Sequence, residues 1–217
     1  MTNGRDTARP GMTPPAKLVA TLGGLGAAAG LLIFLVFAAT EPTIQAHRAA
    51  VLAEAVMDVL GEPERYDTLY LVDGGLSEEP PAGVAPERAE AVYLGYRDGA
   101  PVGFAIRAAS SGFQDTITLL FGYDPSTSQL LGMTILESKE TPGLGDKIYK
   151  DLEFVAEFEG VTPPLLGVKE GSEKGAPGEI VMITGATISS RAVIKAINTE
   201  LERIGPVLTG YGRRPHP

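Results

Sequence analysis

Cysteine is absent from this chain of 217 residues, and only two histidines are present. Without cysteine the chain forms no disulfide, holds no iron–sulfur cluster through its own thiolates and offers no thiol nucleophile. His47 and His216 stand far apart, and neither has a carboxylate or histidine neighbour at the spacing of a metal-ligand set, so we expect no transition-metal site. Any chemistry must therefore come from hydroxyls, carboxylates, backbone amides or an acquired cofactor.

Positive charge is also scarce, because 18 Lys and Arg residues face 27 Asp and Glu residues and the formal net charge is −9. No basic stripe is interleaved with aromatic residues, so we expect no nucleic-acid partner. No G-x-G-x-x-G follows a strand and opens a helix, and no G-K-[ST] or G-x-S-x-G pattern occurs. The carboxylates between residues 137 and 153 show no spacing that marks a catalytic pair.

One long run of the sequence carries no charge at all, from Leu18 to Ala39. As a helix these residues reach about 33 Å, which is enough to cross the hydrocarbon core of a bilayer. The run exceeds the roughly 7–15 apolar residues of a signal-peptide core, which favours an uncleaved single-pass anchor over cleavage near Ala39. Within it, Gly26 and Gly30 form a G-x-x-x-G pattern, which fits either close packing against another membrane helix or simple tolerance of glycine in lipid.

The flanks of this run predict its orientation. Residues 1–17 are polar and basic, whereas Glu41 follows the run. By the positive-inside rule we expect residues 1–17 in the cytoplasm and everything after residue 40 outside it. The expected segments are a cytoplasmic tail at 1–17, a transmembrane helix at 18–39, an extracytoplasmic domain at 40–206 and a disordered tail at 207–217.

The domain after the span reads as α+β, with an antiparallel sheet and flanking helices. Apolar spacing predicts helices, and strand-forming runs separated by turn residues such as Asp98-Gly99 predict a meander. The Gly/Pro/Glu-rich residues 74–86 predict a loop, and Gly205-Pro206 predicts the end of the last helix. The expected helices are 44–60, 146–158 and 188–204, and the expected strands are 68–72, 91–96, 102–108, 116–123, 130–136 and 180–183.

Two glycine-containing loops each lead into a predicted helix. In the first, Pro142-Gly143 predicts a turn, and Asp146 is placed to cap the next helix. In the second, Gly185 permits a tight turn, and Thr187 begins a run of hydroxyl residues at the start of the last helix. The free N–H groups and dipole of that helix favour an anion, although an ordinary Ser/Thr cap explains the same pattern. Together the two loops could hold a flat, phosphorylated ligand.

Two motifs that follow one N-terminal membrane helix resemble those of the FMN-binding domain family. The first motif is Glu140-Thr141-Pro142-Gly143-Leu144-Gly145, and the second is Thr184-Gly185-Ala186-Thr187-Ile188-Ser189-Ser190. In particular the chain resembles the G subunit of the Rnf (Rsx) electron transport complex and, less closely, the C subunit of the sodium-pumping NADH:quinone oxidoreductase. The resemblance extends from about residue 15 to about residue 205.

This resemblance implies that a flavin transferase joins FMN through its phosphate to Thr187. It implies that Thr184, Gly185 and Ala186 shape the turn before that residue. The residues implied along the flavin are Glu140, Thr141, Gly143, Leu144 and Gly145, with Lys169 near the cofactor. Relatives often carry an acid three residues before the first motif threonine, where this chain has Val181, and the nearest acid is Glu179.

The resemblance implies a membrane-anchored electron carrier that works with other membrane subunits of an ion-translocating complex. It implies a bacterial cytoplasmic (inner) membrane crossed once, with the C-terminal domain on the extracytoplasmic (periplasmic) side. Such a chain is an electron-carrying subunit rather than an enzyme by itself. One alternative is a cofactor-free membrane-anchored assembly or binding module, in which the loop before Thr187 only caps a helix. Another is a sensor or maturation protein with the same FMN domain. A further alternative, raised by Val181, is FMN bound without a covalent link.

Overall fold

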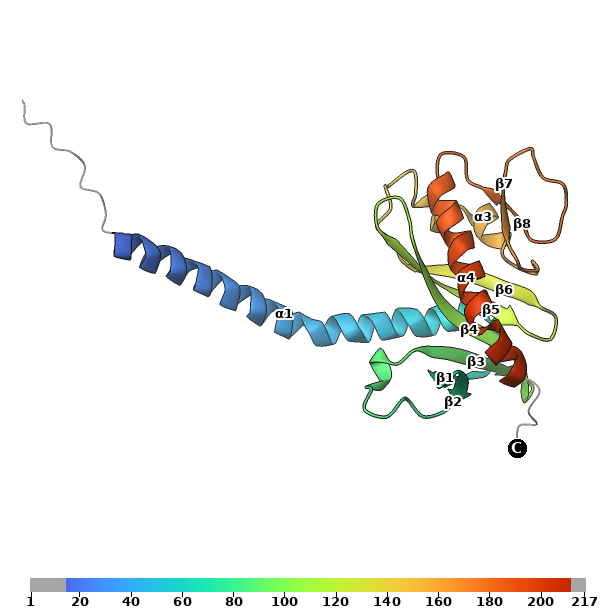
Figure 1. Ribbon diagram of the computed structural model, residues 1–217, viewed down its shortest axis with the longest axis horizontal. Helices are drawn as coiled ribbons and strands as arrows, with labels where there is room; N and C mark the ends of the chain where they lie inside the picture. Colours follow the sequence, from blue (N-terminus) through green and yellow to red (C-terminus); the bar gives the residue numbers. More distant parts are fainter. Residues whose placement is uncertain (1–14, 212–217) are drawn as a thin grey trace, which may run out of the picture. The chain divides into compact units, whose positions relative to one another are not determined.

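The computed structural model describes residues 15–211, so the predicted tails at 1–14 and 212–217 lie outside the described residues. The chain comprises two compact units, residues 1–49 and residues 50–217. The first unit holds most of one long helix, and the second unit is the α+β domain (Figure 1).

The helix α1 runs without a break from Pro15 to Val59. It is long and apolar enough to cross a membrane by length and composition. The separate helix predicted for 44–60 is therefore wrong as a separate element, because the chain remains helical through Pro42. Proline removes one backbone N–H from a helix and can bend it, but it does not always end it. Within the second unit, α1 supplies the buried side chains of Ala55, Val56 and Val59.

The predicted antiparallel meander is confirmed as a six-stranded sheet in the order β2-β1-β3-β4-β5-β6. Asp98 and Gly99, which join β3 to β4, both have positive φ angles (52° and 74°), as a type I′ hairpin turn requires. Two elements were not predicted: β2, which lies inside the predicted loop 74–86, and a short 3₁₀ helix at Pro86–Arg88, which begins at the last residue of that loop. The strands are β1 (Arg65–Val72), β2 (Gly75–Ser77), β3 (Ala91–Arg97), β4 (Ala100–Ser111), β5 (Thr116–Asp124) and β6 (Gln129–Glu137).

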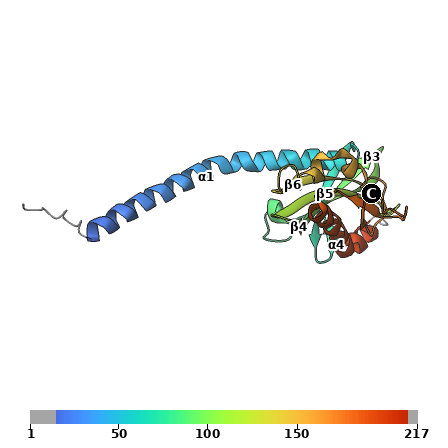
Figure 2. The same ribbon diagram turned by 90° about the horizontal axis from the view of Figure 1, so that it is seen from above.

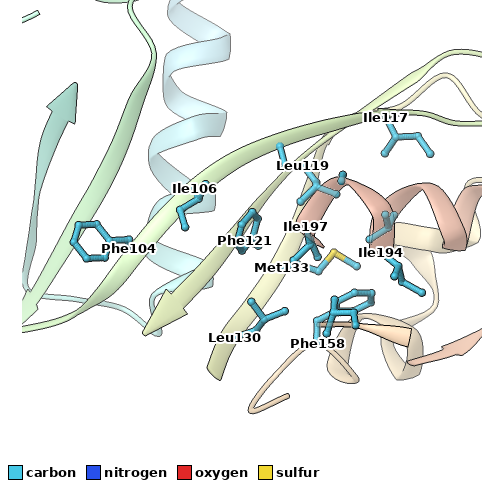
Figure 3. Close-up of a cluster of buried hydrophobic side chains, with 14 of the residues drawn as sticks. Phe104, Ile106, Ile117, Leu119, Phe121, Leu130, Met133, Phe158, Ile194 and Ile197 are labelled. Carbon is cyan, nitrogen blue, oxygen red and sulfur yellow. The ribbon is translucent and has the colours of Figure 1, made fainter. Parts of the chain in front are cut away.

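Helices cover both faces of this sheet, as Figure 2 shows. On one face, the main core packs alternate residues of the strands against α4 (Thr187–Tyr211). Figure 3 shows this core, where Phe121 of β5 lies close to Ile197 of α4. On the other face, Leu120 of β5 packs against Val56 at the end of α1. This alternation of neighbouring residues between two faces follows from the two-residue repeat of a strand.

The segment between β6 and α4 differs from its prediction. The single helix expected at 146–158 is two short helices, α2 (Lys147–Lys150) and α3 (Leu152–Ala156). Asp151 has extended backbone angles between them, and its side chain accepts from the N–H groups of Glu153 and Phe154, which starts a new helix. The parallel pair β7 (Leu166–Lys169) and β8 (Glu179–Met182) follows, and β7 was not predicted.

The predicted end of α4 near Ile204 is also wrong, since α4 continues through Gly205-Pro206 to Tyr211. The expected disordered tail at 207–217 therefore begins inside a helix. Leu208 is fully buried in the core, and the ring of Tyr211 meets that of Phe104 edge to face. The packing of these side chains stabilises the last turns of α4 and offsets the free energy lost with the backbone hydrogen bond that Pro206 removes.

Candidate functional site

The turn before α4 is closed by several hydrogen bonds. Gly185 has a φ angle of +86°, which a residue with a side chain rarely adopts. The N–H of Ala186 donates to the carbonyl of Ile183 at 3.0 Å. The hydroxyl of Ser190 donates to the carbonyl of Ala186 at 3.0 Å and accepts from the N–H of Ile183 at 3.2 Å. This turn places Thr187 at the first residue of α4.

The second loop contains the predicted turn. The N–H of Leu144 donates to the carbonyl of Thr141 at 3.1 Å, and Gly143 has a φ angle of +79°. A proline followed by a glycine with positive φ is typical of a type II turn. The cap predicted at Asp146 is wrong, because its side chain makes no capping hydrogen bond. Instead, one oxygen accepts from the Lys150 ammonium at 2.6 Å, and this bond lowers the pKa of Asp146 despite its burial.

The two loops meet at a pocket with a volume of about 450 Å³, including its open mouth. A third segment, between β4 and β5, contributes to its wall. The lining residues are Phe113, Glu140, Thr141, Leu144, Gly145, Gly185, Ala186, Ile188 and Ser189.

Apolar side chains at this pocket are unusually exposed. Phe113 is 66% exposed, and Leu144 and Ile188 are each 51% exposed. Large apolar side chains that surround a concave site and remain open to water are typical of a ligand-binding or partner-binding surface. They lie beside the first turn of α4, which contains no acidic residue and whose first N–H groups have no partner within the helix. The pocket thus combines apolar walls with the N-terminal end of a helix.

Glu140 is the charged side chain in the pocket wall. It is buried, and its carboxylate accepts from the N–H of Phe113 at 2.9 Å, from the N–H of Gln114 at 3.0 Å and from the hydroxyl of Ser189. Burial acts to raise the pKa of Glu140, but the hydrogen bonds from Ser189, Gln114 and Phe113 outweigh it, and the pKa lies below its usual value. Gln114 also donates from its side chain to the hydroxyl of Thr141 at 2.9 Å.

Most of the residues predicted for the site come together in space. Six of them line the pocket: Glu140, Thr141, Leu144, Gly145, Gly185 and Ala186. Thr187 is half-buried and lies between two lining residues of the chain, Ala186 and Ile188. Thr184 and Gly143 are exposed within the two turns. Lys169 is also exposed, at the end of β7 opposite Met182, and does not line the pocket. That these residues bind FMN stays a prediction.

Sequence reasoning missed three residues of the pocket wall. Ile188 and Ser189 directly follow the predicted turn, and the start of a helix at Thr187 could have placed them beside it. Phe113 lies between two strands and far from both loops in the sequence, so neither motif points to it. The one available indication of a role in the pocket was a large aromatic residue beside Gly112 in a connection between strands.

Comparison with known proteins agrees with this geometry. Residues 112–202 match the FMN-binding domain family, and this range contains all three segments of the pocket. The G subunit of the ion-translocating oxidoreductase complex of Yersinia pestis is 34% identical over 180 residues, which are 82% of this chain and 84% of that protein. The chain belongs to the G-subunit family of Rnf-type ion-translocating oxidoreductases. The corresponding protein of Escherichia coli K12 is 33% identical, over 73% of this chain and 75% of that protein.

Solved structures show the same fold. The crystal structure of NqrC from Shewanella oneidensis superposes with a TM-score of 0.63 at 16% identity, covering 76% of this chain and 99% of that one. The C subunit of the Na⁺-translocating NADH-quinone reductase of Parabacteroides distasonis gives a TM-score of 0.55 at 22% identity, over 65% and 77% of the two chains. This member of the G-subunit family therefore has an NqrC-like fold, with a long apolar helix before an antiparallel-sheet domain.

Val181, which stands where relatives often carry an acid, lies near two carboxylates. It is a residue of β8, and its N–H donates to the carboxylate of Glu157. Burial raises the pKa of Glu157. Glu179, the nearest acid in sequence, accepts from the N–H groups of three loop residues, Lys174, Gly175 and Ala176. Both carboxylates are therefore bound to backbone amides near the strand that leads into the Thr187 turn.

Proposed function

We propose that this chain is a membrane-anchored flavoprotein subunit of an Rnf-type ion-translocating electron transport complex. It relays electrons through FMN, which a flavin transferase attaches by a phosphoester bond to the hydroxyl of Thr187. The single observation that carries this proposal is the pocket itself. Its two loops come from separate parts of the chain and meet where Thr187 begins α4.

The residues of the pocket fit a flavin phosphate. The residue before α4 is Ala186, whose side chain cannot cap a helix. The hydroxyls of Ser189 and Ser190 are also occupied, by Glu140 and by the carbonyl of Ala186. This argues against an ordinary Ser/Thr cap and leaves the N–H groups of the first turn for a phosphate. Phe113, Leu144 and Ile188 offer apolar surface to a flat ring.

A helix N-terminus stabilises an anion by about 0.3–1 kcal/mol, and by about 2 kcal/mol when the site is partly buried. A covalent bond to Thr187 removes the dissociation that so weak an interaction allows. FMN supplies the electron transfer when bound. The N-terminal end of α4 would hold the phosphate, and the exposed side chains of Leu144 and Ile188 would contact the ring.

The anchor completes the proposal. Residues 18–39 of α1 cross the cytoplasmic membrane once, residues 1–17 face the cytoplasm, and the domain from residue 40 to residue 206 lies on the periplasmic side. The relatives' names describe subunits of an oxidoreductase complex, which supports further membrane subunits as electron donor and acceptor. Covalent attachment suits a cofactor that must be retained outside the cytoplasm.

Intact-mass analysis of the full chain, coexpressed with a flavin transferase, tests the attachment. The wild-type chain is expected to gain the mass of one FMN phosphoester and to stay fluorescent in a denaturing gel, whereas Thr187→Val is expected to have the bare mass. Thr184→Val is the matched control, because it removes the other threonine hydroxyl of the turn and leaves Thr187 in place. A bare wild-type mass would favour the cofactor-free module, and a flavin retained by Thr187→Val would refute this linkage.

A further inference from the structure

Glu140 joins all three segments of the pocket wall. It follows β6, yet it accepts from the backbone of the 112–115 loop through Phe113 and Gln114 and from α4 through Ser189. Glu140 is 6% exposed and Ser189 is 2% exposed, so these bonds are shielded from water. Glu140 is separated from Gln114, Phe113 and Ser189 by 26, 27 and 49 residues of sequence. One carboxylate therefore connects parts of the chain that nothing in the local sequence holds together.

Two glycines fix the position of this carboxylate. A Cβ atom added at Gly112 would lie 2.5 Å from one carboxylate oxygen of Glu140. A Cβ atom added at Gly145 would lie 2.7 Å from the other oxygen and 2.9 Å from the Ser189 hydroxyl. The absence of side chains at both positions lets the backbone close around the group. The carboxylate thus has one position, set by three donors and two close backbone contacts.

The charge of Glu140 has no cation beside it, since none of the ion pairs among residues 15–211 includes this residue. Lys139, its neighbour in the chain, pairs with Asp115 instead. The three hydrogen bonds favour the ionised form and keep it charged at neutral pH. Because both oxygens already accept from protein donors, the group contributes charge and shape rather than proton transfer.

We propose that Glu140 is a positioning residue, which holds the three segments of the pocket together and places a fixed negative charge that lowers the reduction potential of the bound flavin. This inference rests on the proposed function. Reduction adds negative charge to the flavin, and a nearby carboxylate opposes that charge more strongly in a partly dry pocket than in water. Charge near the ring is one of the means by which a protein tunes such a cofactor.

The potential is tested with the full chain carrying covalent FMN in detergent, by spectroelectrochemical titration. Glu140→Gln keeps the size of the side chain and removes its charge, and the midpoint potential is expected to shift to a more positive value. Glu137→Gln is the matched control, because it removes an exposed carboxylate three residues earlier that water and salt screen. It is expected to leave the potential unchanged. Equal potentials for wild type and Glu140→Gln would overturn the electrostatic role.

The positioning role has a readout that needs no flavin. Amide hydrogen exchange in the 112–115 segment of the flavin-free chain is expected to be faster in Glu140→Gln than in wild type, and unchanged in Glu137→Gln. Unchanged exchange in Glu140→Gln would overturn this role. If Glu140→Gln takes up no flavin, Glu140→Asp replaces it in both measurements. A midpoint potential near the wild-type value together with faster amide exchange in the 112–115 segment supports the inference. Unchanged amide exchange in that segment refutes it. A wild-type chain without flavin would instead contradict the proposed function.

Discussion

The hydroxyl of Ser190 bonds the backbone of Ile183 across the turn that precedes α4, with 3.2 Å between the Ile183 nitrogen and Ser190 Oγ. The same hydroxyl donates to the carbonyl of Ala186. Ser190 is fully buried, so one side chain inside the helix closes the turn that precedes it. The position of Thr187 therefore depends on a residue three places further along the chain.

Replacing Ser190 with alanine is expected to lower the free energy of unfolding by about 1–3 kcal/mol, because the Ile183 N–H loses its partner in a part-buried place. The looser turn is also expected to slow flavin attachment at Thr187. Urea unfolding of the full chain and a time course of the flavin mass measure the two effects. Thr199→Ala, at an exposed position of the same helix, is the control and is expected to change neither. A Ser190→Ala variant as stable as the control would contradict the role of this hydroxyl.

Gly145 is expected to tolerate no side chain. A Cβ atom there would lie 2.7 Å from the Glu140 Cβ and 2.9 Å from the Ser189 hydroxyl. Gly145→Ala is therefore expected to cost about 1–3 kcal/mol of the free energy of unfolding, since overpacking forces neighbouring atoms apart, and to reduce flavin attachment.

The matched control for this change is Gly210→Ala in α4, where an added Cβ meets nothing within 4 Å. It is expected to be neutral or slightly stabilising, because alanine favours a helix over glycine by about 1 kcal/mol. Thermal unfolding and intact mass compare the two variants. A Gly145→Ala variant that unfolds at the wild-type temperature and carries full flavin would refute the close packing at Glu140.

Sequence reasoning found the meander and both loops because their signals are local. Asp98-Gly99 and Pro142-Gly143 require particular backbone angles wherever they occur, and the structure has them. It failed at α4, where the burial of Leu208, a tertiary contact, extends the helix beyond Pro206. It also failed at Asp151, whose side chain caps a new helix in a segment whose apolar spacing predicts one continuous helix.

The same distinction applies to the candidate site. The glycine and hydroxyl pattern of each loop is visible in the sequence, and the resemblance to a family joined them. The places of Phe113 and Ser189 in the pocket depend on Glu140, from which they are separated by 27 and 49 residues of sequence. Neither periodicity nor a motif records such a contact. Pairing at that distance is set by how the sheet brings β4, β6 and α4 together.

Ionisation of Glu140 is expected to make the stability of the domain depend on pH in acid. The folded pKa of Glu140 lies below its unfolded value, which is about 4.3. The unfolded state then binds more protons, so the contribution of Glu140 is present above about pH 4.3 and is lost as the pH falls through the lower folded pKa.

The measurement is urea unfolding of wild type and Glu140→Gln at a series of pH values. The stability advantage of wild type is expected to be constant near neutral pH and to shrink below about pH 4.3. Glu137→Gln, which removes an exposed carboxylate, is expected to follow the wild-type curve. An advantage that stays the same down to the lowest pH would mean that Glu140 is not held in its ionised form by Phe113, Gln114 and Ser189.

The absence of cysteine makes the membrane orientation directly measurable, because any introduced cysteine is the only thiol in the chain. Glu78→Cys lies at an exposed position of the domain, and Ala16→Cys lies at an exposed position before the apolar run and leaves Lys17 unchanged. With the domain on the periplasmic side, a membrane-impermeant maleimide is expected to label Glu78→Cys in intact spheroplasts and Ala16→Cys only after permeabilisation. The reverse pattern would place the domain, and any flavin on Thr187, in the cytoplasm. Labelling of both before permeabilisation would show that the apolar run does not cross the membrane.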